Sequence, residues 1–336
     1  MTSSVTSPVK SSVTSFVRRG MLLSAAVAIL PLAHAQSAWP TKPVTLVHPY
    51  AAGGPADAMA RALGQQLSKR LNQPFVVESK AGGAATIGTG YVARAKPDGY
   101  TLLISTSAGH VVTPLMQKIP YDGIADFSFI AVVANQPNVL VAHPSLGVSN
   151  LKELMTYAQK NPGALNYASA GTGGATHLGA EAFAQAAKIS MTHVPYGGAA
   201  PALKDLLGGQ VQLGMLNLSA TRPFIEEGRL KAVAYGGTQR TPLLPQVPTM
   251  AELGYGSTAT ATWYSLAAPK GTPPEIIETL HKAFEGVSAD PEWQKVLANQ
   301  GAEQLKLTPA ETTAFVQKDK AAMQQLLGTL GLLAEK

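Results

Sequence analysis

Two glycine-rich stretches carry the clearest chemistry in this chain of 336 residues. The first is Pro49–Arg61 (PYAAGGPADAMAR) and the second is Tyr167–Ala180 (YASAGTGGATHLGA). Each stretch follows a β-branched or aromatic segment and runs into a helical pattern. Such turns direct unpaired backbone N–H groups and the positive end of a helix toward one point, which creates a site for an anion. Neither stretch places a nucleophile beside a general base, so the pattern favours capture of an anion over catalysis.

The first stretch offers small residues that let a ligand approach the backbone closely. Pro55 suits the first position of the following helix, and Asp57 in the first turn complements the helix dipole. Because a carboxylate repels an anion, we expect Asp57 either to organise the helix start or to bind an amine or a bridging water. The candidate ligand-binding residues of this stretch are Tyr50, Ala51, Ala52, Gly53, Gly54 and Asp57.

The second stretch adds hydroxyl groups to backbone amides. We expect the hydroxyls of Ser169, Thr172 and Thr176 to donate hydrogen bonds to the ligand. We also expect the loop glycines Gly171, Gly173 and Gly174 to expose their amides to it. His177 is predicted either to bind a carboxylate or to cap the helix locally. The candidate ligand-binding residues of this stretch are Ser169, Ala170, Gly171, Thr172, Gly173, Thr176 and His177.

Further candidates lie elsewhere in the chain. Asn217 follows the apolar segment VQLGML, at the carboxyl end of an expected strand, where ligand crevices of α/β sheets form. Trp263 either lines the cleft or belongs to the core. Ser107, Pro195 and Tyr196 complete the set of candidate ligand-binding residues.

Several catalytic and cofactor motifs are missing from the sequence. It has no G-x-S-x-G elbow, no Walker A motif and no H-E-x-x-H motif, and no two of its seven histidines stand four residues apart. Gly88–Ala93 matches the dinucleotide fingerprint G-x-G-x-x-A, but no strand immediately precedes it and no acid follows at the expected distance. We interpret these glycines as helix–sheet packing residues, and we predict no cofactor, no metal site and no catalytic residue.

The first 35 residues have the features of an export signal. Lys10 and the pair Arg18–Arg19 form a basic start, and Met21–Leu32 is an apolar segment of 12 residues, shorter than the roughly 20 that span a bilayer. Ala33–Ala35 gives a small-x-small pattern, so we expect cleavage after Ala35. An uncleaved membrane anchor is the alternative. The arginine pair loosely resembles a twin-arginine signal, but the residue before it is not the usual Ser or Thr, so the general secretion route is favoured.

Composition narrows the range of partners. The formal net charge is +6, and three of these positive charges belong to the leader. No cluster of Lys or Arg with interleaved aromatic residues is present, so we expect no nucleic-acid partner. Cysteine is absent, which excludes a disulfide framework and thiol chemistry. The length that remains after the leader suits two domains with substantial cores.

Apolar runs of strand type alternate with helical patterns along most of the chain, which is typical of parallel βαβ units. In the first half, strands are expected at Val44–His48, Phe75–Val77 and Thr101–Ser105. In the second half, strands are expected at Val139–Ala142, Leu165–Ala168, Thr192–Val194, Val211–Met215 and Ala232–Tyr235. Amphipathic helices are expected between them, for example at Leu151–Lys160 and Ala202–Leu207.

The pattern changes after residue 262, where one strand (WYSLAA) precedes long helices at Pro274–Val287, Pro291–Asn299 and Pro309–Leu330. We expect this helical run to fold back onto the first half. The chain then crosses between two lobes near residues 135–140 and 258–264. The predicted lobes are 36–138 together with 262–336, and 139–261.

A series of short motifs, taken in order, resembles the Bug-type periplasmic solute-binding proteins of tripartite tricarboxylate transporters. The resemblance extends over nearly all of the chain after the leader. The matching segments are Trp39–Pro43, Pro49–Asp57, Lys96–Leu102, Pro120–Asp122 with Asp126–Phe127, Leu165–Leu178, His193–Gly198, Pro201–Gln212 and Trp263–Pro273. The chain departs from the family at three places: His48 replaces an apolar residue, Gly174 replaces a frequent Ser, and Ser79–Ala81 (SKA) replaces Asn-Arg-Pro.

The resemblance implies an α/β fold of the two-lobed periplasmic-binding type II class, with a mostly parallel sheet flanked by helices in each lobe. In the family, two glycine loops hold one carboxylate through backbone amides, hydroxyls and ordered waters, and here these loops are Tyr50–Asp57 and Ser169–His177. The distal end of the ligand sets specificity, and the departures at His48 and Lys80 bear on it. The expected ligands are aliphatic dicarboxylates, tricarboxylates, aromatic acids or acidic amino acids.

The expected function is that of a monomeric periplasmic receptor, which closes on a small organic carboxylate and delivers it to the permease subunits of a tripartite tricarboxylate transporter. One alternative is a periplasmic sensor whose closed form signals to a two-component sensor kinase. Another is an exported α/β enzyme that acts on carboxylates, which the missing catalytic motifs disfavour.

Overall fold

The computed structural model describes residues 1–7 and 39–334. Its compact body is Pro40–Lys336, and Met1–Trp39 is a separate unit. The leader predicted for residues 1–35, with its cleavage position, lies almost wholly outside the described residues. Within the described ranges, no helix has both the length and the apolar character that a membrane crossing needs.

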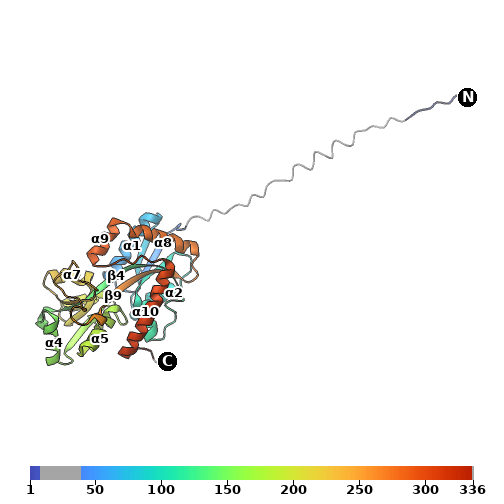
Figure 1. The fold of residues 1–336 in the computed structure, drawn as a ribbon. Helices are drawn as coiled ribbons and strands as arrows, with labels where there is room; N and C mark the ends of the chain where they lie inside the picture. The colour runs from blue at the N-terminus through green and yellow to red at the C-terminus, as the bar shows by residue number, and fades with distance from the viewer. Residues whose placement is uncertain (8–38, 335–336) are drawn as a thin grey trace. The chain divides into compact units, whose positions relative to one another are not determined.

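The body is built on one sheet in which parallel strands flank a central antiparallel pair (Figure 1). The strands are β1 Val44–His48, β2 Phe75–Ser79, β3 Thr101–Ser105, β4 Phe127–Ala142, β5 Leu165–Ser169, β6 Met191–Pro195, β7 Leu213–Asn217, β8 Lys231–Tyr235 and β9 Ala261–Pro269. Their order is β2-β1-β3-β9-β4-β7-β5-β6, and β8 also pairs with β4. On one side β1 pairs in parallel with β2 and β3, and on the other side β5 pairs in parallel with β6 and β7. The predicted α/β class is confirmed.

Strand β4 runs through both halves of the sheet, and β9 pairs with its first part. They pair antiparallel from Phe127↔Pro269 to Pro137↔Ala261, and β4 then continues into pairs with β7 and β8. The crossings predicted near residues 135–140 and 258–264 fall at this junction, and the predicted lobe boundary at residue 138 lies inside β4. The sequence predicted only the last part of β4 as a strand. The polar, proline-containing segment 135–138 (NQPN) interrupts the apolar pattern, but the sheet accommodates it because β4 changes neighbours there.

Helices cover the sheet between the strands. They are α1 Pro55–Leu71, α2 Thr86–Ala93, α3 Thr113–Met116, α4 Leu151–Lys160, α5 Ala175–Ala187, α6 Ala199–Leu207, α7 Leu218–Glu226, α8 Pro274–Ser288, α9 Pro291–Gln300 and α10 Pro309–Leu330. In Figure 1, α8 and α9 lie beside α1, and the ion pair between Arg70 and Asp290 (2.9 Å) joins α1 to the start of α9. Gly88 in α2 is a packing residue, because a Cβ there would lie 2.9 Å from the Cα of Pro49.

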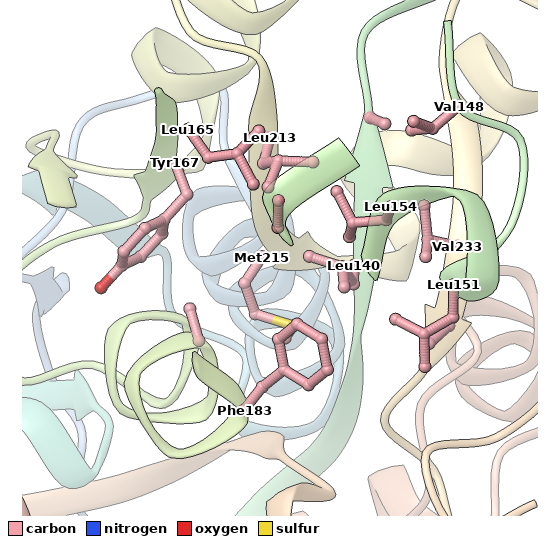
Figure 2. Close-up of a cluster of buried hydrophobic side chains, with 14 of the residues drawn as sticks. Leu140, Val148, Leu151, Leu154, Leu165, Tyr167, Phe183, Leu213, Met215 and Val233 are labelled. Atoms are coloured by element: carbon pink, nitrogen blue, oxygen red, sulfur yellow. The ribbon is translucent and has the colours of Figure 1, made fainter. Parts of the chain in front are cut away.

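Each half of the sheet has its own hydrophobic core. In the second half, Leu140, Phe183 and Met215 are fully buried and gather under α4 and α5 (Figure 2). In the first half, Val316 and Leu327 of α10 belong to a core that includes Val111 and Phe129, and α10 packs on β4. Burying such side chains contributes about 1.5–3 kcal/mol each. These cores hold the carboxyl ends of the parallel strands in place.

Candidate ligand-binding cleft

A cavity of about 300 Å³ lies at the carboxyl ends of the parallel strands, where crevices of α/β sheets form. Both halves of the sheet contribute to its wall. Ten of the predicted ligand-binding residues line it: Tyr50, Ala51, Gly54, Ala170, Gly171, Thr172, Thr176, Pro195, Tyr196 and Asn217. The structure thus brings the two glycine loops, which are more than 100 residues apart in sequence, to one place.

Four helices begin at this cavity. Their N-caps are Gly54 for α1, Gly174 for α5, Gly198 for α6 and Asn217 for α7, and none of these caps forms a side-chain hydrogen bond to its helix. Within the described part of the chain, no acceptor is found for several backbone N–H groups at these starts. Those on the cavity wall belong to Gly54, Ala56, Thr172, Ala175, Thr176 and Ala199. Together with the positive helix ends, they make an environment that favours an anion.

The wall of the cavity carries no charged side chain among the described residues that form it. Its polar side chains are hydroxyls and one amide, from Tyr50, Thr106, Thr172, Thr176, Tyr196, Asn217, Thr262 and Tyr264. Burial raises the pKa of Tyr50 to about 12, so its hydroxyl, 2.5 Å from Thr106 Oγ1, stays neutral. Over the ranges that the structure covers, no three His, Cys, Asp or Glu side chains cluster as metal ligands would. Any anion held here is therefore held by neutral donors.

Asp57 lies behind the first loop and not on the cavity wall. Its carboxylate accepts hydrogen bonds from the Gly53 N–H (3.0 Å) and from Arg61 Nε (3.0 Å), and it lies 3.2 Å from His48 Nε2. Burial alone would raise the pKa of Asp57, but the hydrogen bonds from Arg61 and Gly53, with the charge of Arg61, outweigh burial and lower it. Burial lowers the pKa of His48, which the neighbouring Asp57 only partly offsets. Asp57 thus fixes the loop and turns the Gly53 amide away from the cavity.

The second loop differs from expectation in the direction of its glycine amides. Gly171 N–H donates to Ser169 Oγ (3.2 Å), Gly173 N–H to His177 Nδ1 (3.2 Å), and Gly174 N–H to the Gly171 carbonyl (3.2 Å). These amides are used inside the loop and are not offered to a ligand. Gly173 is needed for another reason: its φ is +76°, and a Cβ there would lie 3.2 Å from Val112.

The other predicted residues outside the wall have structural contacts. Ser169 and His177 are buried under the second loop, while Ala52 and Gly53 are exposed in the first. Ser107 donates a hydrogen bond to Asp319 of α10. Trp263 is 5% exposed and packs edge-on against Phe315, with ring centroids 5.5 Å apart, so it belongs to the core.

A third loop, Tyr196–Gly198 between β6 and α6, closes the cavity from the second half. Its Gly197 carbonyl accepts a hydrogen bond from the Ala51 N–H at 2.8 Å. A Cβ on Gly54 would lie 3.6 Å from the Ala200 nitrogen, so the starts of α1 and α6 face each other closely. The sequence pattern predicted Tyr196 here but missed Gly197 and the start of α6.

One wall segment, Gly82–Ala85 after β2, was missed altogether. All four of its residues have positive φ, including Ala84 (+52°) and Ala85 (+74°), which is unusual outside glycine. The Ala84 carbonyl accepts a hydrogen bond from Thr113 Oγ1 (2.8 Å). The Gly-Gly pair following a strand was the available signal. The other wall residues missed are Pro49, Pro55, Ala56, Thr106, Ala108, Ala175, Ala199, Thr262 and Tyr264.

Lys80 does not line the cavity. Its Nζ lies 2.6 Å from Glu78 Oε1 and 4.2 Å from the centre of the Tyr91 ring. The hydrogen bond from Lys80 to Glu78 raises the pKa of the lysine. These contacts direct its charge toward the surface and not toward a ligand.

The chain resembles known proteins over most of its length. A model of the "Tripartite tricarboxylate transporter family receptor" matches residues 59–332. Protein BugT of Bordetella pertussis is 36% identical over 280 residues, which cover 83% of this chain and 86% of BugT. The solved periplasmic binding protein BugD is 36% identical with a TM-score of 0.84, covering 88% of this chain and 100% of BugD.

Two further solved structures contain ligands. A protein of R. palustris with adipate is 34% identical, with a TM-score of 0.85, covering 88% of this chain and 100% of that protein. MatC from Rhodopseudomonas palustris with bound malate is 30% identical, with a TM-score of 0.81, covering 86% of this chain and 99% of MatC. On the family match, together with these relatives, the chain belongs to the receptor family of tripartite tricarboxylate transporters.

Proposed function

We propose that this protein is a receptor that binds a small organic carboxylate in the cavity between the two halves of the sheet. The observation that carries the proposal is the uncharged wall at which α1, α5, α6 and α7 begin. Each helix start carries about half a positive charge, and the free amides supply directed donors. This arrangement suits a small anion, and membership of this receptor family favours a carboxylate as that anion.

The ligand class is an aliphatic dicarboxylate. Two similar proteins were solved with adipate and with malate, which are both dicarboxylates. The methyl groups of Ala51, Ala84 and Ala108 on the wall suit a carbon chain, and the hydroxyls of Tyr50 and Thr262 suit a second polar end. The described wall offers no carboxylate to pair with an ammonium group, and burying an unpaired charge is costly, which disfavours amino acids.

The protein acts in the periplasm as a monomer that the leader sequence exports. There it delivers the captured ligand to the permease subunits of a tripartite tricarboxylate transporter. Family membership supports this output over signalling to a sensor kinase. The protein acts without chemistry, because the described wall pairs no nucleophile with a general base. Genes for a permease beside the gene for this protein would support delivery, and a sensor-kinase gene alone would support signalling.

A thermal-shift experiment tests the binding proposal. The protein is unfolded and refolded to remove any ligand carried through purification, and is then heated with adipate, malate or the uncharged adipamide. We expect at least one diacid to raise Tm and adipamide to have no effect, since a ligand at 100 times its Kd adds about 2.7 kcal/mol of stability. The diacid should be recovered unchanged after long incubation. No shift with any carboxylate, or formation of a product, would contradict the proposal.

A further inference from the structure

The second glycine loop lies on a stack of three aromatic rings. His177 of α5 and His193 of β6 stack with ring centroids 4.0 Å apart and an interplanar angle of 23°. Tyr167 of β5 also stacks on His193, with ring centroids 5.0 Å apart and an interplanar angle of 22°. The three rings come from three separate elements, so the stack joins the two strands to the helix at the point where the loop leaves the sheet.

Hydrogen bonds connect this stack to the loop backbone. His177 Nδ1 accepts the Gly173 N–H at 3.2 Å, while His193 Nε2 lies 2.7 Å from Ser169 Oγ. The same Oγ accepts the Gly171 N–H at 3.2 Å. Each histidine therefore controls one glycine amide of the loop, His177 directly and His193 through Ser169. The amides of Thr172, Ala175 and Thr176 have no acceptor within the described chain and remain available at the wall.

The bond from Gly173 requires an unprotonated Nδ1 on His177, because only a lone pair can accept it. The proton of the neutral ring is then on Nε2, which lies 4.0 Å from Glu181 Oε1. Glu181 also accepts the Tyr167 hydroxyl at 2.5 Å. These are the titratable groups that α5, β5 and β6 place around the stack. Two protonated imidazoles at this separation would repel each other, so the stack favours neutral rings.

We propose that His177 and His193 are positioning residues for the carboxylate, holding the second loop in its binding shape as a pair of neutral imidazoles. This inference rests on the proposed function. The histidines do not touch the ligand; by engaging the amides of Gly173 and Gly171 they turn those of Thr172, Ala175 and Thr176 toward the cavity. Protonation of His177 converts Nδ1 from an acceptor into a donor, which expels the Gly173 amide and deforms the loop.

Two substitutions separate the hydrogen bond from the packing. His177→Asn places an amide oxygen near the position of Nδ1 and keeps an acceptor that does not titrate, whereas His177→Phe keeps the stack and removes the acceptor. The matched control is His143→Phe in the second half, because among the described residues the His143 side chain hydrogen-bonds only to Ser145 and lies outside the cavity wall. The probes are adipate and malate, titrated calorimetrically at pH 7.5.

We expect His177→Phe to weaken binding at least about tenfold, and His177→Asn and His143→Phe to change Kd less than about threefold. Burial lowers the pKa of His177 to about 4, and burial together with His177 lowers that of His193 to about 4. Protonation of the dicarboxylate weakens binding to both proteins alike in acid, but the parent should lose more affinity than His177→Asn as the pH falls to 4. Equal binding by parent and Phe variant, or identical pH profiles for parent and Asn variant, would overturn the inference.

A measurement without ligand keeps the inference separate from the proposed function. Nuclear magnetic resonance of the free parent protein should show the His177 ring and the Gly173 amide titrating together, with the amide shifting as its acceptor is lost. A Gly173 amide that ignores the protonation of His177 would overturn the inference, whatever the protein binds. Failure of the parent to bind any carboxylate, with this joint titration present, would instead reject only the proposed function.

Discussion

The backbone N–H of Ala51 donates to the carbonyl oxygen of Gly197 across 2.8 Å. This bond joins the loop after β1, in the first half of the sheet, to the loop after β6, in the second. It lies on the cavity wall, beside the facing starts of α1 and α6. A direct backbone contact between the two halves of the sheet therefore forms part of the cavity wall.

Gly198→Ala should weaken ligand binding by disturbing the hydrogen bond between Ala51 and Gly197. Gly198 has a φ of +156°, and a Cβ there would lie 3.2 Å from the Ala51 nitrogen. We expect Kd for a bound dicarboxylate to rise about tenfold or more, because a displaced Ala51–Gly197 contact shifts both loops that line the cavity. Gly163→Ala is the control, since Gly163 also has positive φ (+78°) but has open space at the Cβ position. If both variants bind alike, the Ala51–Gly197 contact has no part in binding.

Binding should depend only weakly on salt. The described cavity wall carries no Lys or Arg, so the carboxylate is attracted by amides and helix ends at short range. At an ionic strength of 0.1 M, salt screens mainly the interactions between exposed charges that lie more than about 10 Å apart. We expect Kd to change less than about threefold between 20 and 300 mM NaCl in calorimetric titrations. A steep loss of affinity would instead point to a cation in the site.

Asp57→Asn should loosen the first loop. The change removes the charge that pairs with Arg61 and weakens the hydrogen bond from the Gly53 amide. We therefore expect the free energy of unfolding to fall by about 1–3 kcal/mol. Ligand affinity should fall as well. Glu226→Gln breaks an i,i+4 pair with Arg222 at the exposed surface and should leave both quantities unchanged. Equal effects of the two substitutions would show that Asp57 has no special role in the loop.

The free energy of unfolding should fall with acid over a window set by buried histidines. Burial lowers the pKa values of His110 and His177 to about 4, below the ordinary value of 6.5. Below pH 6.5 these histidines therefore bind protons in the unfolded chain but stay neutral in the folded chain. The free energy of unfolding is thus highest above pH 6.5 and falls as the pH drops toward 4. Each buried histidine contributes on the order of 3 kcal/mol to this loss. Urea unfolding at pH 7.5, 5.5 and 4.5 measures this loss. His177→Asn should make the free energy of unfolding depend less on pH. A free energy of unfolding that does not change with pH in the parent would contradict the prediction.

Much of the fold follows from local pattern. The helices Leu151–Lys160 and Pro309–Leu330 begin and end where the sequence predicts, because strong caps mark them: Asn150 accepts from Glu153 N–H, and Thr308 forms a capping box with Glu311. The beginning of β4 could not be found this way. Its length depends on pairing with β9, which is more than 100 residues away in sequence.

The site was harder to predict because neighbouring residues of a strand point to opposite faces. Trp263 and Tyr264 are adjacent in β9, yet Tyr264 lines the cavity and Trp263 enters the core. The adjacent residues after β3 differ in a similar way, because Thr106 lines the cavity whereas Ser107 donates a hydrogen bond to Asp319. Sequence places each pair near the strand end but does not say which member faces the ligand. The amide directions in the second loop likewise depend on His177 and Ser169, which only the folded chain brings into position.

The most direct test is a crystal structure of the protein with the dicarboxylate that stabilises it most. We expect carboxylate oxygens about 2.7–3.1 Å from the free amides of Thr172, Ala175 and Thr176, a usual N–H···O distance, with no Lys or Arg in contact. Gly173 N–H should remain bonded to His177 Nδ1. A carboxylate paired with a lysine or arginine, or bound outside the cavity where α1, α5 and α6 begin, would show that neutral loop amides do not capture the ligand.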